Sequence, residues 1–303
     1  MTFKTNKILI VPMVSFLLLL SACASGLYNM DSTARRKLAG LQEKSVHIDK
    51  FAIAYLEGGT GTSVLLLHGF GADKDNWIRF ARYLKGSYHI VAPDLPGFGD
   101  STMLMNEQYD IDSQVKRIHE FTRAIGMTKF HIAGNSMGGL ISGVYAATYP
   151  DDVLSLGLID PGGVLDREMS QLTIALKKGK NPLVVSEASE YKNFINFVFE
   201  NPPFIPGMVK NYLGDKAVKR KEFYQKVFAE ARPADQLERK MMDIHAKTLI
   251  IWGDMDKVFP ASSAEVLDKG IDDSQVIIMK KCGHVPMIER PAETARYYID
   301  FIR

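Results

Sequence analysis

Cysteine and net charge are both scarce in this sequence. Its 303 residues include two cysteines, Cys23 and Cys282, which excludes a framework of several disulfides and a zinc site built mainly from thiolates. Lys and Arg number 37 against 35 Asp and Glu, so we predict no basic surface that would bind nucleic acid. Hydrophobic residues make up 46% of the chain. This content can bury a large core, so we expect one domain or a core with an inserted subdomain.

The first 22 residues have the layout of a secretory signal peptide. Lysines at positions 4 and 7 precede the apolar run 8–20, and two small residues follow it. Cys23 comes next and completes the sequence LSAC, which resembles the lipobox of bacterial lipoproteins. In those proteins the cysteine becomes the lipid-modified first residue of the mature chain. Two or more acyl chains on one residue hold a protein stably on a membrane.

This resemblance implies a lipid attached to Cys23, with residues 23–44 as a polar tether between the membrane and the rest of the protein. The protein would then lie in the bacterial cell envelope, lipid-anchored at the outer membrane, or be secreted. The alternative is an uncleaved membrane anchor. No charged residue occurs between Ile8 and Met30, and an uncharged stretch of this length could span a bilayer.

From residue 45 onward, short apolar runs alternate with segments of helical spacing. A hairpin is predicted first, from residues 46–48 and 51–55. The later runs are brief and rich in Val, Ile and Leu, which is typical of strands buried on both faces. Strands separated by helices pair in parallel through right-handed crossovers, so we predict a mostly parallel sheet with helices on both faces. The predicted strands after the hairpin are 63–67, 88–92, 130–133, 153–159, 248–252 and 275–279.

The alternation stops between residues 161 and 244, where helical spacing recurs and no clear strand is present. An all-helical insertion in an alternating fold is typical of a cap over the carboxyl ends of the strands, where open α/β sheets bind their ligands. We therefore predict a core formed by residues 45–160 and 245–303 and a helical cap formed by residues 161–244. The stretches of helical spacing in the cap are 169–178, 187–199 and 216–229.

The strongest local motif is GNSMGG at residues 134–139, which follows a predicted strand and opens a predicted helix. It matches the G-x-S-x-G nucleophile elbow in the strand-turn-helix setting that this motif requires. Such a turn strains the backbone of the serine, and the glycines leave room for neighbouring backbone. We predict that Ser136 is a catalytic nucleophile.

A serine nucleophile needs a nearby base, and the base needs a carboxylate partner. His284 follows the predicted strand 275–279 and is the candidate base. Asp256 follows the strand 248–252 and is the candidate acid, although Asp254 and Asp160 also lie just after core strands. The chain order is then Ser, Asp, His, which is the order of α/β-hydrolases and of neither chymotrypsin nor subtilisin.

The oxyanion formed during acyl transfer needs hydrogen-bond donors that are fixed before the reaction. One predicted donor is the backbone N–H of Met137, directly after the nucleophile. The other is the backbone N–H of Phe70, because the glycines in the loop HGFG at 68–71 let the backbone bend toward the site. We expect His68 to brace this loop. No histidine or carboxylate pair has the spacing of metal ligands, so neither a metal nor a cofactor is expected.

With these motifs the chain resembles α/β-hydrolase lipases of the Moraxella and Psychrobacter type and monoacylglycerol lipases of the abhydrolase family, from about residue 51 to the C-terminus. The resemblance implies an α/β-hydrolase fold with an eight-stranded sheet. It also implies a triad of Ser136, Asp256 and His284, an oxyanion hole at Phe70 and Met137, and a lipid ester such as an acylglycerol as substrate. The motifs are HGFG (68–71), DLPGFGDS (94–101), GNSMGG (134–139), WGDMD (252–256) and GHVPMIE (283–289).

Two other functions are compatible with parts of this pattern. Hydrolases that cleave carbon–carbon bonds in ring-cleavage products share the GNSMGG elbow, but here Val285 follows the histidine where an aromatic residue would be expected. An export signal also does not suit an intracellular catabolic step. The second alternative is a ligand-binding protein that keeps the fold without turnover, which would normally have lost a member of the triad.

No sequence feature indicates an oligomeric state. Several apolar residues of the cap could line an acyl tunnel, although an aromatic stripe at helical spacing more often belongs to the hydrophobic core. They are Phe194, Phe197, Val198, Phe199 and Phe204.

Overall fold

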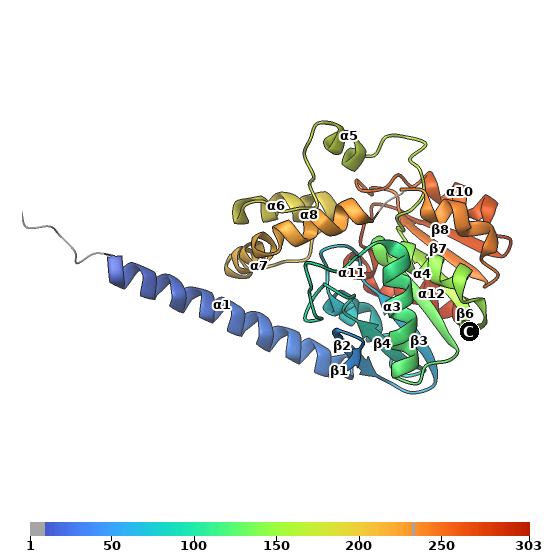
Figure 1. Ribbon diagram of the computed structural model, residues 1–303, viewed down its shortest axis with the longest axis horizontal. Coiled ribbons are helices and arrows are strands. Elements are labelled where there is room, and N and C mark those ends of the chain that lie inside the picture. Colours follow the sequence, from blue (N-terminus) through green and yellow to red (C-terminus); the bar gives the residue numbers. More distant parts are fainter. Residues whose placement is uncertain (1–9, 232–233) are drawn as a thin grey trace, which may run out of the picture.

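The computed structural model describes residues 10–231 and 234–303, and the start of the predicted signal peptide, residues 1–9, lies outside them. Within the described residues, one eight-stranded sheet has the order β1-β2-β4-β3-β5-β6-β7-β8 (Figure 1). The pairs β1–β2 and β2–β4 are antiparallel and all other neighbours are parallel, which confirms the predicted mostly parallel sheet. The strands are β1 (Leu41–Ile48), β2 (Phe51–Gly58), β3 (Thr62–Leu67), β4 (Tyr88–Pro93), β5 (Phe130–Asn135), β6 (Val153–Ile159), β7 (Thr248–Gly253) and β8 (Ser274–Met279).

Helices cover both faces of the sheet, and strand side chains alternate between two hydrophobic cores. Along β3, Val64 and Leu66 belong to one core, and Leu65 and Leu67 belong to the other. Strands buried on both faces therefore need the continuous apolar runs that the sequence shows. The first core contains side chains of α2 (Ile78–Ala81), α11 (Pro286–Glu289) and α12 (Pro291–Ile302), and the second contains those of α3 (Ile111–Ala124), α4 (Met137–Thr148) and α10 (Ser263–Gly270).

In its described residues, the chain between β6 and β7 contains helices joined by loops and no strand, as the helical spacing predicts. One predicted helix, 216–229, is in fact two, because Arg220 leaves the helical backbone with φ −104° and ψ 6°. The first of these begins earlier than predicted, at Gly207. Its glycines weaken the helical signal, but Gly214 allows close packing, since a Cβ there would lie 2.8 Å from the carbonyl oxygen of Ala188. The helices are α5 (Gln171–Lys177), α6 (Tyr191–Val198), α7 (Gly207–Lys219), α8 (Lys221–Glu230) and α9 (Gln236–Lys240).

The N-terminal segment differs from the predicted tether. α1 (Ile10–Leu38) runs through Cys23, and β1 starts at Leu41, so residues 23–44 form the second half of a helix and the start of the sheet. Figure 1 shows the first part of α1 projecting from the body while its end meets the body beside β1. None of the helices in the described part of the chain combines the length and the apolar character needed to cross a membrane.

Contacts to distant parts of the chain explain why this polar segment is helical. Near the end of α1, Arg36 pairs with Asp75 at 2.7 Å and with Glu43 at 2.6 Å. One face of the helix also carries Tyr28, whose ring centroid lies 5.8 Å from that of Tyr212 in α7. Tertiary packing thus supplies the stability that helix propensity alone does not.

Candidate active site

Ser136 occupies the turn between β5 and α4, with a backbone φ of 58° and ψ of −121°. A residue with a side chain rarely adopts this conformation, and such strain is typical of a nucleophile elbow. The turn is held because the Ser136 N–H donates to the carbonyl of Ile159 at 3.1 Å. Glycines make the turn possible: a Cβ on Gly134 would overlap the carbonyl oxygen of Gly138, and one on Gly138 would overlap that of Leu67.

His284 lies on the loop after β8, and its Nδ1 is 2.8 Å from Oδ2 of Asp256. The other carboxylate oxygen, Oδ1, accepts the backbone N–H groups of Val258 at 2.7 Å and Phe259 at 3.2 Å. Both side chains of the His284–Asp256 pair are buried. A fixed carboxylate beside Nδ1 keeps the proton on that nitrogen, so the second ring nitrogen is available to accept a proton.

The two alternative aspartates have different surroundings. Asp254 accepts the backbone N–H of Lys281 at 2.6 Å and so shapes the loop that leads to His284. Asp160 is wholly buried, and atoms of Asp160, Asp256 and His284 lie within 4.8 Å of one another. Among the described residues these three also form the one group of potential ligands close enough together to hold a metal ion. Within it, His284 Nδ1 and Asp256 Oδ2 are 2.8 Å apart and are hydrogen-bonded to each other. Of the three aspartates, Asp256 is the one hydrogen-bonded to His284.

The two predicted oxyanion donors, Met137 and Phe70, belong to segments that adjoin Ser136. Met137 is the following residue and the first residue of α4. Phe70 belongs to a loop that approaches the serine closely, since a Cβ on Gly69 would lie 3.0 Å from the Cβ of Ser136. The absence of a side chain at Gly69 therefore permits this approach.

His68 braces that loop. Its Nδ1 lies 2.8 Å from the carbonyl oxygen of Gly69, and its Nε2 accepts the backbone N–H of Leu95 at 2.9 Å. Burial lowers the pKa of His68 to about 4. The ring is therefore neutral at neutral pH, as an Nε2 acceptor requires.

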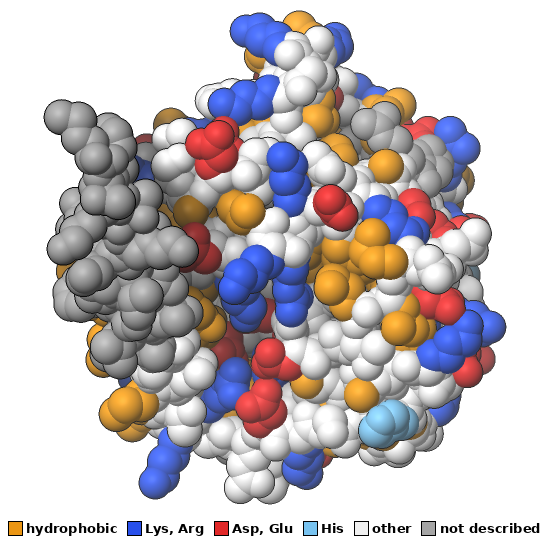
Figure 2. All heavy atoms as spheres, turned by 60° about the vertical axis from the view of Figure 1, so that its left-hand side comes forward, with side chains coloured by type: hydrophobic (Ala, Val, Ile, Leu, Met, Phe, Trp, Pro, Cys, Tyr) orange, Lys and Arg blue, Asp and Glu red, His pale blue; other side chains and the backbone are white. Residues whose placement is uncertain are grey.

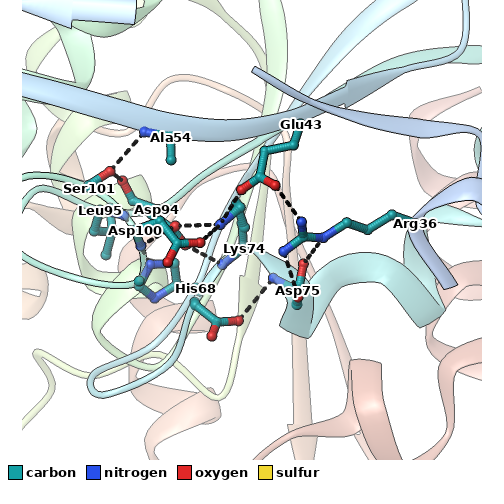
Figure 3. A network of polar contacts seen from close by, with 12 residues as sticks. Arg36, Glu43, Ala54, His68, Lys74, Asp75, Asp94, Leu95, Asp100 and Ser101 are labelled. Carbon is teal, nitrogen blue, oxygen red and sulfur yellow. Dashed lines mark hydrogen bonds and ion pairs between the residues drawn. The ribbon is translucent and has the colours of Figure 1, made fainter. Parts of the chain in front are cut away.

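An ion network centred on the buried Lys74 holds the 94–101 loop to which His68 is bonded (Figure 3). Lys74 Nζ lies 2.8 Å from Asp94, 2.6 Å from Asp100 and 3.0 Å from Glu43. Glu43 also pairs with Arg36, which ties α1 to the same network. Burial opposes the charge of Lys74, but Asp94 and Asp100 raise its pKa above the usual value. Lys74 is thus charged throughout the physiological range.

A cavity of about 710 Å³ contains both Ser136 and His284 in its wall. Its size is that of pockets which enclose small organic ligands. Four of the five apolar candidates named from the sequence line it, namely Phe194, Val198, Phe199 and Phe204. Phe197 instead packs against the hydrophobic core.

One wall of this cavity was missed from the sequence. It comes from α1, whose positions 27, 28, 31, 32 and 35 face the cavity. These positions recur at a spacing of three to four residues and so mark one face of a helix, which is the signal that could have revealed them. Residues 208, 209 and 213 of α7 add a further apolar wall.

Comparison with known proteins identifies the family of this chain. Residues 62–291 match the alpha/beta hydrolase fold family. Lipase 1 of Psychrobacter immobilis is 37% identical over 272 residues, which cover 88% of this chain and 86% of that protein. Monoacylglycerol lipase ABHD6 of Homo sapiens is 34% identical, with coverage of 97% and 92%. A crystal structure described as a membrane phospholipase A, a bacterial virulence factor, is 44% identical with a TM-score of 0.89, and covers 96% of this chain and 97% of that one.

These relatives are lipases, and they do not favour a carbon–carbon bond hydrolase or a non-catalytic binding protein. The resemblance inferred from five short motifs is confirmed over most of the chain. The protein is a carboxylic-ester hydrolase of the lipase type and belongs to the α/β-hydrolase fold family.

Proposed function

We propose that the enzyme cleaves fatty acyl esters of membrane lipids, acylglycerols or related glycerol lipids, through an acyl-enzyme intermediate. The observation that carries this proposal is the cavity of about 710 Å³, which joins Ser136 and His284 to apolar side chains of the cap and of α1. An acyl chain gains free energy by leaving water for such a surface. The related phospholipase and monoacylglycerol lipases differ in the lipids they are named for, but both cleave acyl esters of glycerol.

In this proposal the Ser136 hydroxyl oxygen attacks the ester carbonyl while His284 takes its proton. His284 then returns the proton to the leaving alcohol. In the second half of the reaction, water attacks the acyl carbonyl while His284 takes a proton from it, and His284 then returns this proton to the Ser136 oxygen as the acid is released. Asp256 holds the imidazole in the productive tautomer and stabilises the imidazolium ion. The backbone N–H groups of Phe70 and Met137 would stabilise the negative charge that develops on the carbonyl oxygen.

The proposal extends to the location of the enzyme. A lipid attached at Cys23 would hold it in the cell envelope, at the outer membrane. Cys23 belongs to α1, the same helix that lines the cavity from residue 27 onward. Figure 2 views the side on which α1 and α7 lie and shows hydrophobic side chains scattered among charges of both signs. Exposed hydrophobic residues of α1, α7 and the preceding loop include Leu27, Met30, Phe204 and Met208.

The substrate class is tested with p-nitrophenyl esters of increasing chain length and with the variant Tyr28→Ala. Tyr28 lines the cavity, so removing its ring should raise KM for long-chain esters about fivefold by loss of apolar contact, with short-chain esters and kcat unchanged. Steady-state kinetics of the full-length protein in detergent gives both values.

Tyr83→Ala is the matched control, because Tyr83 is 44% exposed and does not line the cavity. It should leave KM unchanged for every ester. Equal effects of Tyr28→Ala on short and long esters would argue against an acyl site along α1. Faster turnover of a dienoate ring-cleavage product than of monoacylglycerol or phospholipid would overturn the proposed substrate class.

Lipidation of Cys23 is tested by growing cells with labelled palmitate. The wild-type protein should incorporate label and sediment with membranes, and Cys23→Ser should lose both properties. Cys282→Ser is the control, because Cys282 is a buried free cysteine and its replacement should leave labelling intact. Label that survives Cys23→Ser would reject lipidation at Cys23. Membrane sedimentation of a wild-type protein that takes up no label would reject it as well and would favour the uncleaved membrane anchor.

A further inference from the structure

Asp160 is a buried carboxyl group beside the proposed triad to which the mechanism gives no role. It follows β6 directly and has a backbone φ of 44°, a conformation that few residues with a side chain adopt. Its own N–H donates to the carbonyl of Ile251 at 2.9 Å, and its Oδ1 accepts the backbone N–H of Gly253 at 2.9 Å. Two hydrogen bonds, one from its backbone and one to its side chain, therefore hold this residue against β7, the strand that leads to Asp256.

The second oxygen of this carboxyl group, Oδ2, is buried and has no hydrogen-bond partner at contact distance among the described residues. A buried carboxylate in that position would be costly, because a charge removed from water needs a counter-charge or several donors. A protonated carboxyl group is less costly, but its O–H needs an acceptor. Carboxylate oxygens of Asp160 and Asp256 lie within 4.8 Å of each other, so Asp256 provides that acceptor after a small rotation of the side chain.

We propose that Asp160 is a neutral positioning residue, whose O–H donates a hydrogen bond to Asp256 and fixes that carboxylate beside His284. The inference rests on the proposed triad and adds a residue to it. Asp256 would then be held by backbone donors on Oδ1, by His284 on Oδ2 and by Asp160 from the β6 side.

The titratable surroundings of Asp160 agree with a neutral carboxyl group. Burial raises the pKa of Asp160 well above its usual value, and the charge of Asp256 raises it further. A like charge in close proximity keeps one of two carboxyl groups protonated. The titratable groups around Asp160 are Asp256, His284, Cys282 and Glu289.

Two substitutions separate a hydrogen-bond donor from a second negative charge. In Asp160→Asn the amide oxygen can still accept from Gly253 and the amide N–H can still donate to Asp256, so kcat/KM should stay within about twofold of the wild type. Asp160→Leu has a similar volume but no donor, so kcat/KM should fall roughly tenfold. Without the donor, the negative charge of Asp256 acts more strongly on its surroundings and favours the protonated, inactive form of the site, so the acid limb of the pH–activity profile should move to higher pH.

The opposite pattern would overturn the proposal. If Asp160 were ionised, Asp160→Asn would remove a negative charge, lower activity and move the acid limb to lower pH. A structural role alone would lower activity without moving the limb. Tyr298→Phe is the control for the loss of a buried polar atom, since its hydroxyl is also buried without a partner in the described part of the chain and its ring lies against Gly157 of β6. Thermal unfolding of each variant shows whether the fold is retained.

A double-mutant cycle tests whether Asp160 acts through Asp256. In an Asp256→Ala background, Asp160→Leu should cause no further loss of kcat with a soluble p-nitrophenyl ester. A second double variant combines Asp256→Ala with Asp160→Asn. A further loss of kcat in this variant would show that Asp160 itself acts as the carboxylate partner of His284, which would refute the positioning role. Full activity of Ser136→Ala or Asp256→Asn would instead reject the proposed triad, so the two failures are distinguishable.

Discussion

Asp256→Asn is expected to lower kcat by roughly 10⁴, with a much smaller change in KM, because the amide can no longer fix the tautomer of His284 or stabilise the imidazolium. The 2.8 Å contact between His284 Nδ1 and Asp256 Oδ2 is the basis of this expectation. Asparagine keeps the volume of the side chain and can still accept backbone N–H groups, so the fold should be retained. Stopped-flow or steady-state assays with a p-nitrophenyl ester give the rate, and thermal unfolding checks the fold.

Asp254→Asn is the matched control, because Asp254 lies in the same loop but bonds to the backbone of Lys281 rather than to His284. It should retain activity close to that of the wild type. Ser136→Ala should abolish both turnover and labelling by a fluorophosphonate probe. A mild effect of Asp256→Asn together with a large effect of Asp160→Asn would transfer the acid role to Asp160.

Lys74→Met is expected to lower the free energy of unfolding by about 3 kcal/mol, since removing one partner of a buried ion pair leaves an uncompensated charge. The Lys74 side chain is 1% exposed, and its partner Asp94 is fully buried. Asp94 would still accept the backbone N–H groups of Lys74 and Asp100, which places the expected loss at the lower end for buried pairs. Urea unfolding followed by fluorescence measures the change through the shift in midpoint at constant slope.

Lys50→Met is the control for this prediction. Lys50 also pairs with a carboxylate, that of Glu107 at 2.5 Å, but its side chain is 57% exposed. Solvent screens such a pair, so its removal should leave the unfolding midpoint unchanged. Equal effects of the two substitutions would mean that the Lys74 network does not hold the 94–101 loop more firmly than a surface pair would.

The fold class and the strained turn at Ser136 were predictable because their signals are local. The strand-turn-helix pattern around Ser136 lies within about twenty consecutive residues, and glycines at 134 and 138 are needed wherever that turn forms. Buried strands also reveal themselves locally, because β5 and β7 are covered on both faces and consist mainly of apolar residues.

The choice among three aspartates was less accessible to sequence reasoning. Each of Asp160, Asp254 and Asp256 follows a core strand, so spacing alone leaves all three as candidates. Which one meets His284 depends on the turn taken after the strand, where Asp256 accepts two backbone N–H groups and Asp254 is directed to Lys281. That direction is set by contacts between β7 and the loop after β8, which lie about 30 residues apart in sequence.

By itself the sequence determined the alternating sheet, the helical insertion and the motif that places Ser136, because these depend on the periodicity and backbone freedom of neighbouring residues. The tertiary structure alone decided that the polar segment after Cys23 is a helix and a wall of the active-site cavity. That helix is stabilised by partners from distant segments, Asp75 for Arg36 and Tyr212 for Tyr28, and its cavity face shares one cavity with residues of α6 and α7. The spacing along α1 marks one face of a helix, but it does not say which distant residues meet that face, since the free energy of those contacts arises only after the chain has folded.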